Sequence, residues 1–279
     1  MHSGHITLNG ITSPALRSGD QNLSTAIVFV HGNPGSCQDW ADLVESAGLF
    51  SRCIAIDMPG FGQAGKPDSF NYSIDGYVAH LQALIEFEKI EKVHLVLHDL
   101  GGPWGLHWAK NHPDKLASIS LLNTGINIGY RWHYMARIWR TPILGEISMA
   151  ITTRWSMKQA LKHGNPRGLP DAYFDEIYRN YDRATRKAVL KMYRSADNLG
   201  YEVLAAKLAP SQIPTLVVWG AADPYVPVKY AEMQREYFAV ERVVILPDSG
   251  HWPMIDNRPA VRDAVIPFLK KQLEPLTVV

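Results

Sequence analysis

Short apolar runs recur along the chain, and segments with helical character separate them. Each run is rich in β-branched side chains and apolar without alternation, which is typical of strands covered on both faces of a sheet. The runs are "AIVFV" (26–30), "CIAI" (53–56), "VHLVL" (93–97), "ASISLL" (117–122), "TLVVW" (215–219) and "RVVIL" (242–246). This alternation predicts an α/β fold whose mostly parallel central sheet forms through right-handed crossovers.

Two of the intervening segments have clear helical patterns. Residues 73–90 begin with Ser73, a residue type that caps helix N-termini, and residues 228–238 keep an apolar face. In open sheets of this kind, ligands bind beyond the carboxyl ends of the strands. We therefore expect the functional residues in the loops that follow positions 30, 97, 122, 219 and 246.

Residues 126–208 break the alternation. They contain helical stretches, many aromatic residues and Gly/Pro breakers, but no good strand. We interpret them as a helical cap over the sheet, with 1–125 and 209–279 forming the core. This segment has fourteen Lys and Arg against seven Asp and Glu, a net charge of +7 that leaves −6 for the rest of the chain. The charge indicates either a solvated helical surface or attraction of an anionic substrate or acidic partner.

Composition excludes several classes of protein. Lys plus Arg is 28 and Asp plus Glu is 27, so the chain lacks the basic field of a nucleic-acid binder. It has no signal-peptide pattern, and no apolar run approaches the roughly 20 residues that span a bilayer. Neither Cys37 nor Cys53 belongs to a metal-binding pattern. We expect a cytoplasmic protein without a membrane span, metal or organic cofactor, and leave its oligomeric state open.

The stretch "LVLHDLGGPWG" (95–105) has the strand, turn and helix in which the motif G-x-S-x-G places a nucleophilic serine. Asp99 stands at the position of the serine. A structural aspartate that caps the helix is the alternative interpretation. Asp223 and His251, however, each follow a later predicted strand, so the chain order is nucleophile, acid, histidine, as in α/β hydrolases. Asp99, Asp223 and His251 are therefore the predicted catalytic residues.

With these motifs the sequence resembles the α/β-hydrolase fold superfamily, in its epoxide hydrolase and haloalkane dehalogenase branch. The resemblance rests on "HGNPGSCQDW" (31–40), "DMPGFGQAGKP" (57–67), "HDLGGPWGLHWA" (98–109), "WGAADPYVP" (219–227) and "SGHWP" (249–253). It implies an aspartate nucleophile at Asp99 and a helical cap inserted after the sixth strand. It also implies an oxyanion hole formed by the backbone amides of Asn33 and Leu100.

An aspartate nucleophile suits attack on saturated carbon. A carboxylate is already ionised at neutral pH and can displace a leaving group, which gives an alkyl ester. Water activated by His251, which Asp223 orients, would then attack the carbonyl carbon of that ester. The chain contains no G-x-S-x-G motif, so ordinary serine esterase chemistry is not expected.

The leaving group decides the substrate, an epoxide or an alkyl halide. Epoxide hydrolases use cap tyrosines to protonate the opening ring, and here Tyr193 and Tyr134 match them, although either could serve in packing instead. We favour epoxide hydrolysis, which gives a vicinal diol.

The alternative is a haloalkane dehalogenase. In one group of these enzymes an asparagine, matched by Asn33, binds the halide, and Trp132, Trp139 or Trp155 could supply an indole N–H. The sequence departs from that pattern because Leu100 stands where dehalogenases usually carry tryptophan. A noncatalytic ligand-binding protein with the same fold is a further alternative.

Overall fold

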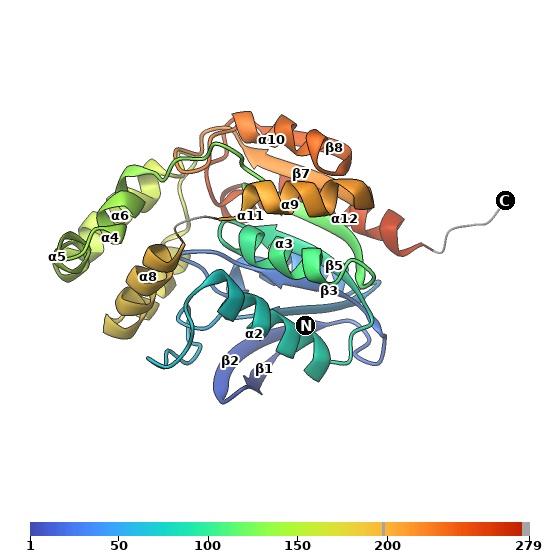
Figure 1. Cartoon of the computed structure of the whole chain (residues 1–279), viewed down its shortest axis with the longest axis horizontal. Coiled ribbons are helices and arrows are strands. Elements are labelled where there is room, and N and C mark those ends of the chain that lie inside the picture. The colour runs from blue at the N-terminus through green and yellow to red at the C-terminus, as the bar shows by residue number, and fades with distance from the viewer. Residues whose placement is uncertain (197–198, 275–279) are drawn as a thin grey trace.

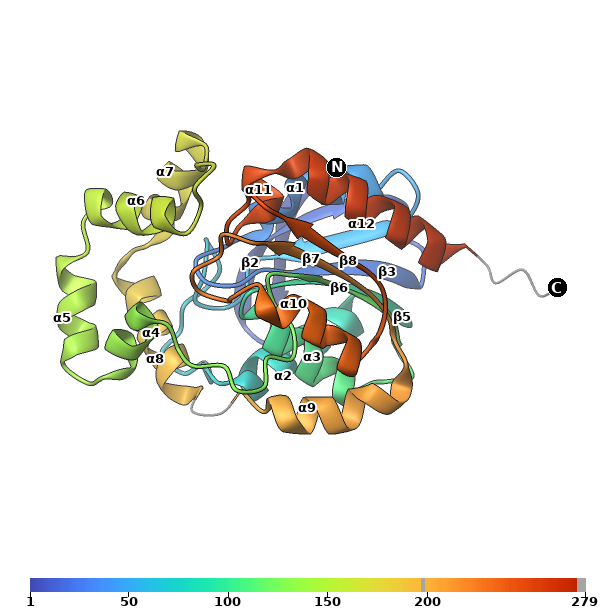
Figure 2. The same cartoon turned by 90° about the horizontal axis from the view of Figure 1, so that it is seen from above.

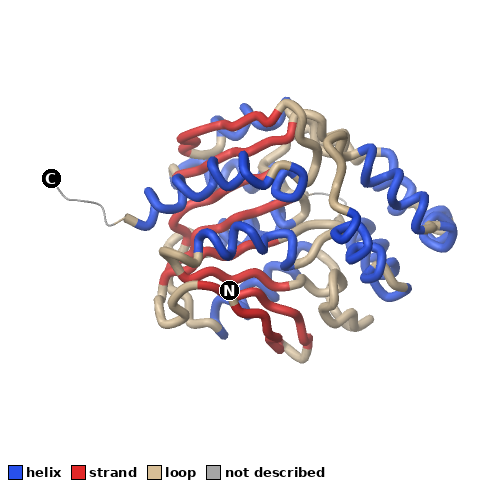
Figure 3. Tube along the Cα trace, turned by 180° about the vertical axis from the view of Figure 1, so that it is seen from behind, coloured by secondary structure: helices blue, strands red, loops and turns tan. Residues whose placement is uncertain are grey.

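The structure is a computed structural model that describes residues 1–196 and 199–274. Its centre is an eight-stranded sheet with the strand order β1-β2-β4-β3-β5-β6-β7-β8 (Figures 1 and 3). The strands are β1 (His2–Leu8), β2 (Ile11–Ser18), β3 (Thr25–Val30), β4 (Arg52–Ile56), β5 (Lys92–His98), β6 (Leu116–Leu122), β7 (Pro214–Gly220) and β8 (Ala239–Leu246). All six predicted strands are present, and the predicted α/β-hydrolase architecture is confirmed.

The sheet is parallel from β4 to β8, whereas β1 and β2 form an antiparallel hairpin that pairs with β4. The central strands β3, β4 and β5 are buried along almost their whole length. Burial on both faces explains why these runs are continuously apolar. The carboxyl ends of the parallel strands lie at one edge of the sheet, and the functional loops leave from there.

Helices cover both faces of the sheet, as Figure 2 shows. Helices α1 and α12 pack together on one face, and α3 lies between α2 and α9 on the other. As predicted, Ser73 caps α2 by accepting a hydrogen bond from the amide of Gly76. These core helices are α1 (Ala41–Ala47), α2 (Ile74–Phe87), α3 (Gly101–Asn111), α9 (Tyr201–Leu208), α10 (Lys229–Met233), α11 (Pro253–Asp256) and α12 (Arg258–Leu273).

Five helices between β6 and β7 stand apart from the sheet at its carboxyl edge (Figures 1 and 2). They are α4 (Tyr134–Arg140), α5 (Leu144–Ile151), α6 (Arg154–His163), α7 (Asp171–Asn180) and α8 (Arg183–Ser195). The segment predicted as the cap, 126–208, also includes α9, but α9 packs against α3 in the core layer. The part that stands over the sheet is therefore shorter than predicted, because α9 buries its apolar face on the core.

Among residues 1–196 and 199–274, no helix combines the length and apolar character that crossing a bilayer requires. The same residues contain no group of three or more His, Cys, Asp or Glu arranged to hold a metal ion.

Candidate active site

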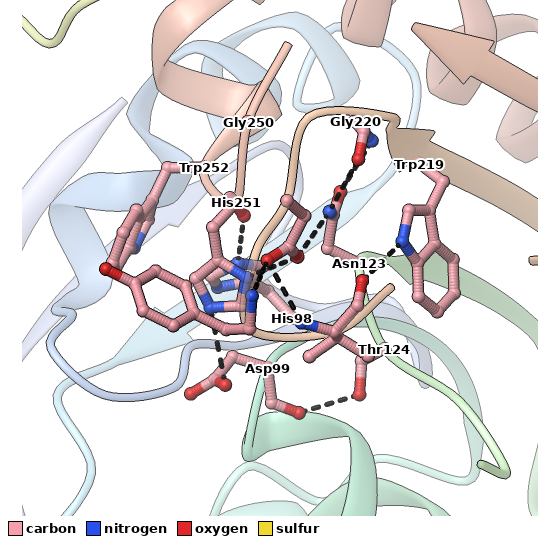
Figure 4. A network of polar contacts seen from close by, with 12 residues as sticks. His98, Asp99, Asn123, Thr124, Trp219, Gly220, Gly250, His251 and Trp252 are labelled. Atoms are coloured by element: carbon pink, nitrogen blue, oxygen red, sulfur yellow. Dashed lines mark hydrogen bonds and ion pairs between the residues drawn. The ribbon is translucent and has the colours of Figure 1, made fainter. Parts of the chain in front are cut away.

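Asp99 lies in the sharp turn between β5 and α3, with a left-handed backbone at φ +48°. Few non-glycine residues adopt this conformation, and such strain is concentrated at functional sites. Thr124, which follows β6, holds the turn: its hydroxyl donates to the carbonyl of Asp99 at 2.7 Å (Figure 4). The loop after β3 also approaches closely, since a Cβ at Gly32 would collide with the Asp99 carboxylate. Glycine at position 32 lets that backbone reach the nucleophile.

The structure brings the three predicted catalytic residues together. Nδ1 of His251 donates to Oδ2 of Asp223 at 2.6 Å, and Nε2 of His251 lies 3.4 Å from Oδ2 of Asp99 (Figure 4). His251 is buried, and the Asp99 side chain retains 14% exposure toward the space beside it. Nε2 therefore faces the nucleophile, while Nδ1 is held by the acid, the arrangement that a general base requires.

Several groups fix the Asp223 carboxylate. The side-chain amide of Asn123 donates to Oδ2 at 2.7 Å, and the backbone amides of Tyr225 and Val226 donate to Oδ1 at 2.7 and 3.0 Å. These three donors hold the carboxylate in one orientation beside His251. Asp223 can therefore orient His251 and stabilise its positive charge.

The loop that carries His251 is fixed from two sides. His98 donates from Nε2 to the carbonyl of His251 at 2.7 Å, and burial lowers the pKa of His98 to about 3, so its ring is neutral. On the other side, the amide of His251 donates to the carbonyl of Gly164 at 2.8 Å, and the amide of Trp252 donates to Asn165. The loop after α6 therefore holds the loop of His251 from the cap side, and His98 holds it from the core side.

The side chains of Asp99 and His251 form an ion pair. Burial acts to raise the pKa of Asp99, but the hydrogen bond and charge of His251 hold that pKa well below its usual range. Burial acts in the opposite sense on His251, but the charges of Asp223 and Asp99 and their hydrogen bonds raise its pKa. Both shifts favour an ionised Asp99 beside a protonated His251.

One predicted oxyanion-hole amide already contacts the nucleophile. The amide of Asn33 donates to Oδ1 of Asp99 at 2.7 Å. Leu100 is buried and is the N-cap residue of α3, directly after Asp99. A contribution from the Leu100 amide to the oxyanion hole stays a prediction.

A cavity of about 360 Å³ lies between the cap helices and the catalytic residues. Most of its lining is apolar, and no Lys or Arg is among the described residues that form it. The positive charge of the cap therefore lies elsewhere, and nothing in the lining of the cavity supports attraction of an anionic substrate. The core contributes Asn33, Pro34, Asp99, Tyr225, His251 and Trp252; the cap contributes His133, Met135, Trp139, Ser148, Ile151, Thr152, Ser156, Met157, Ala160, Leu161, Tyr181 and Tyr193.

Of the three cap residues predicted first, Tyr193, Tyr134 and Trp132, Tyr193 alone is among the described residues that line this cavity. It is buried on α8, and its hydroxyl accepts a hydrogen bond from the side-chain amide of Asn33 at 3.4 Å. The prediction for Tyr134 is wrong, because its side chain is 68% exposed at the start of α4. The prediction for Trp132 is also wrong. It packs edge-on against Tyr193, 5.3 Å between ring centroids, outside the cavity lining.

His133, between those two residues, lines the cavity instead. It is the N-cap of α4, and its Nδ1 accepts a hydrogen bond from the amide of Ala136 at 3.3 Å. Burial lowers the pKa of His133 to about 4, so the ring is neutral. Because Nδ1 is the acceptor, the ring proton resides on Nε2. The helical pattern after His133 could have indicated that His133 is the N-cap residue of α4. That its side chain faces the cavity is not evident from the sequence.

Trp139 also lines the cavity, whereas Trp155 is exposed. The indole N–H of Trp139 is buried and donates to no acceptor among the described residues. The sequence offered three tryptophans as equal candidates for this place. Their places in the fold distinguish them, since Trp132 precedes α4, Trp139 lies on α4 and Trp155 lies on α6.

Comparison with known proteins gives one family. A family model described as alpha/beta hydrolase fold matches residues 25–258. The chain is 27% identical to an acetyltransferase component of an acetoin cleaving system from Pseudomonas putida, and spans 64% of its length. It is 30% identical over 179 residues to a haloalkane dehalogenase of Mesorhizobium japonicum, covering 60% of this chain and 57% of the relative. Epoxide hydrolase 3 of Xenopus tropicalis is 23% identical, with 96% of this chain and 78% of the relative covered.

Two solved structures have the same fold over almost the whole chain. A haloalkane dehalogenase from Bradyrhizobium elkani superposes with a TM-score of 0.85 at 24% identity, covering 97% of this chain and 98% of the other. A mutant epoxide hydrolase from Vigna radiata superposes with a TM-score of 0.81 at 21% identity, covering 97% and 98%. At these identities the likeness concerns the fold.

Proposed function

Because the chain belongs to the α/β-hydrolase fold family, we propose that it is a hydrolase in which Asp99 forms an alkyl ester with its substrate, most favourably an epoxide. The Asp99 carboxylate attacks a ring carbon, the bond from that carbon to the ring oxygen breaks, and the oxygen takes up a proton. Water then attacks the ester carbonyl while His251 accepts a proton from it. The amide of Asn33 stabilises the resulting oxyanion. When the bond from the carbonyl carbon to the alkyl oxygen breaks, that oxygen takes the proton from His251 and a diol leaves, and the regenerated carboxyl group of Asp99 returns its proton to His251.

The ion pair couples these two steps. While Asp99 is ionised, it helps to hold His251 in its protonated form, which cannot act as a base. Esterification removes the negative charge of Asp99, so the pKa of His251 falls. Ring opening takes one proton from an acid that lines the cavity. The proton that His251 releases as its pKa falls can restore that acid. Formation of the ester thus prepares the base that hydrolyses it.

This coupling makes a testable prediction. Asparagine at position 99 has the size of aspartate but no charge, so it represents the ester electrostatically. We expect Asp99→Asn to lower the pKa of His251 by roughly 1–3, the usual effect of losing an opposite charge within about 4–6 Å. NMR titration of the His251 ring in the two proteins measures it. An unchanged pKa of His251 would show that the charge of Asp99 does not control the base.

Two donors near Asp99 favour an oxygen leaving group. The hydroxyl of Tyr193 accepts from Asn33 and donates to no acceptor within the described residues, so its proton is available. Tyr193 is the observation that carries the epoxide assignment. His133, with its ring centroid 6.4 Å from that of Tyr193, is the second, through Nε2–H. A phenol is a suitable acid for an alkoxide that develops during ring opening.

We predict that Tyr193→Phe lowers kcat for epoxides by roughly 10²–10⁴-fold, the usual contribution of a general acid. His133→Asn, which keeps an N-capping residue, should also lower kcat, because it removes the Nε2 donor. Steady-state kinetics with a terminal aryl epoxide measures both effects. Tyr134→Phe is the matched control, since Tyr134 is exposed. Equal activity of Tyr193→Phe and the control would remove Tyr193 from the mechanism.

A haloalkane is the second candidate substrate, and Trp139 is the observation that favours it. Its unpaired indole N–H and the side-chain amide of Asn33 both belong to the cavity and could hold a departing halide. A panel of terminal epoxides and 1-haloalkanes, assayed for diol and for halide release, distinguishes the two reactions. Diol from epoxides without halide release supports the proposal, and the reverse supports a dehalogenase. No turnover of either class, with binding retained, would indicate a noncatalytic protein.

A further inference from the structure

Large apolar side chains are exposed along α5, at the residue before it and at the start of α6. They are Ile143, Leu144, Ile147, Ile151 and Trp155, which we call the cap stripe, and each is more than half exposed. Leu144, Ile147 and Ile151 recur at helical spacing and therefore lie along one face of α5. Scattered single apolar residues are ordinary at protein surfaces, but a contiguous exposed set marks a contact surface.

The backbone before α5 is strained in the conformation that presents this stripe. Ile143 has φ +70° and ψ −52°, and the amide of Leu144 donates to the carbonyl of Pro142 at 2.9 Å, which closes a tight γ-turn. A β-branched residue rarely adopts a positive φ. Persistent strain of this kind is associated with function. Here the turn leaves the side chain of Ile143 72% exposed, next to Leu144.

The cap stripe lies at the outer end of the molecule. Figure 2 shows α5 as the part of the cap farthest from the sheet, and the stripe side chains stay more than half exposed although α5 packs against α4 and α8. Its helix also borders the active-site cavity, since Ser148, Ile151 and Thr152 line that cavity. Ile151 is both 70% exposed and part of the lining, which places it at the opening of the cavity.

The net charge of the segment that contains the stripe indicates the kind of partner. Residues 134–163, which span α4 to α6, have five Lys and Arg against one acidic residue, Glu146. Arg154 and Lys158 pair with carboxylates of α7, whereas Arg137 and Lys162 are exposed and form no salt bridge within the described residues. Two copies that met through this face would bring like charges together. An anionic surface is complementary to it.

We propose that the cap stripe docks the protein on the surface of an anionic lipid bilayer, with α5 lying in the interface. Aliphatic side chains would enter the acyl boundary, and Trp155 would lie at the headgroup level, which indoles prefer. Arg137 and Lys162 would contact anionic headgroups. With the cavity opening at Ile151, a substrate dissolved in the bilayer has a short path to Asp99. This last point rests on the proposed function and implies a lipophilic epoxide.

Vesicle co-sedimentation tests the docking without any use of catalysis. The full chain is mixed with vesicles of phosphatidylcholine, or of equal parts phosphatidylcholine and phosphatidylglycerol. We expect binding to the anionic vesicles that weakens with salt. The triple variant Leu144→Ser, Ile147→Ser, Trp155→Ser should weaken it by about tenfold or more, because losing even one buried large side chain can have that effect.

Two controls separate the contributions. Leu49→Ser with Phe87→Ser removes two apolar residues outside 134–163 that are also more than half exposed, and it should leave vesicle binding unchanged. Arg137→Gln with Lys162→Gln should reduce binding to anionic vesicles only. Absence of vesicle binding by the unaltered protein would overturn the proposal. So would concentration-dependent self-association that the triple variant abolishes while vesicles fail to bind, because the stripe would then join two copies.

Discussion

Replacing His251 with glutamine is expected to stop the reaction after a single cycle and leave the substrate attached to the protein. Asp99 still attacks in this variant, because the amide of Asn33 continues to stabilise its carboxylate. The ester then persists, since no other side chain in the described structure pairs with Asp223 and also faces Asp99, as His251 does through Nδ1 and Nε2. We expect ester hydrolysis to slow by roughly 10²–10⁴-fold, the usual contribution of a general base.

Intact-mass spectrometry measures the trapped ester and also identifies the substrate class. An epoxide adds its whole mass to the protein, whereas a haloalkane adds its mass less that of the hydrogen halide. Digestion should locate the addition in the peptide that contains Asp99. The double variant His251→Gln with Asp99→Ala is the control and should gain no mass. Sustained turnover by His251→Gln alone would exclude His251 as the base.

The second large effect is expected from Asp99 itself. Asp99→Ala removes the only group that the proposal allows to bond to the substrate, and turnover should fall by about 10⁴-fold or more. Because Asp99 has a positive φ, alanine also strains the turn, so a loss of activity could reflect misfolding. Asp99→Asn controls for this, since asparagine tolerates the left-handed region.

Both variants should be inactive, and Asp99→Asn should unfold thermally near the temperature of the unaltered protein. Substrate binding should also survive in the asparagine variant, because the cavity is otherwise unchanged. Activity of Asp99→Asn within about tenfold of the unaltered enzyme would contradict covalent catalysis, since one such factor is only about 1.4 kcal/mol of barrier.

Much of the core could be predicted because its physical signal is local. Strands β3 to β6 are buried on both faces, so their apolar runs are continuous and easy to recognise. The hairpin of β1 and β2 was not predicted, since its strands are partly exposed and their patterns are mixed. Asn9 and Gly10, both with positive φ, form its two-residue turn. This pair was the available signal, because Asn-Gly is typical of such hairpins.

The grouping of Asp99, Asp223 and His251 could be predicted for a different reason. In a parallel sheet, residues that follow successive strands meet at one edge whatever their separation in the sequence. Asp99, Asp223 and His251 obey this rule, and their distances follow from it.

The cap offered no such rule. The choice of His133 over its neighbours Trp132 and Tyr134 depends on how one capping hydrogen bond turns the start of α4. The basic charge of the cap could be counted, but its location outside the cavity lining could not. The packing of the cap helices determines which side chains face the cavity and where the basic residues lie. A short sequence pattern does not contain this information.

A single turnover in water enriched in ¹⁸O tests the covalent route most directly. With enzyme in excess over an epoxide, the water that attacks the ester carbonyl contributes its oxygen to the side chain of Asp99. We predict ¹⁸O in the Asp99 peptide and unlabelled diol after the first cycle. Label in the diol, with none in the protein, would mean that water attacks the substrate directly, and the proposed ester would then be excluded.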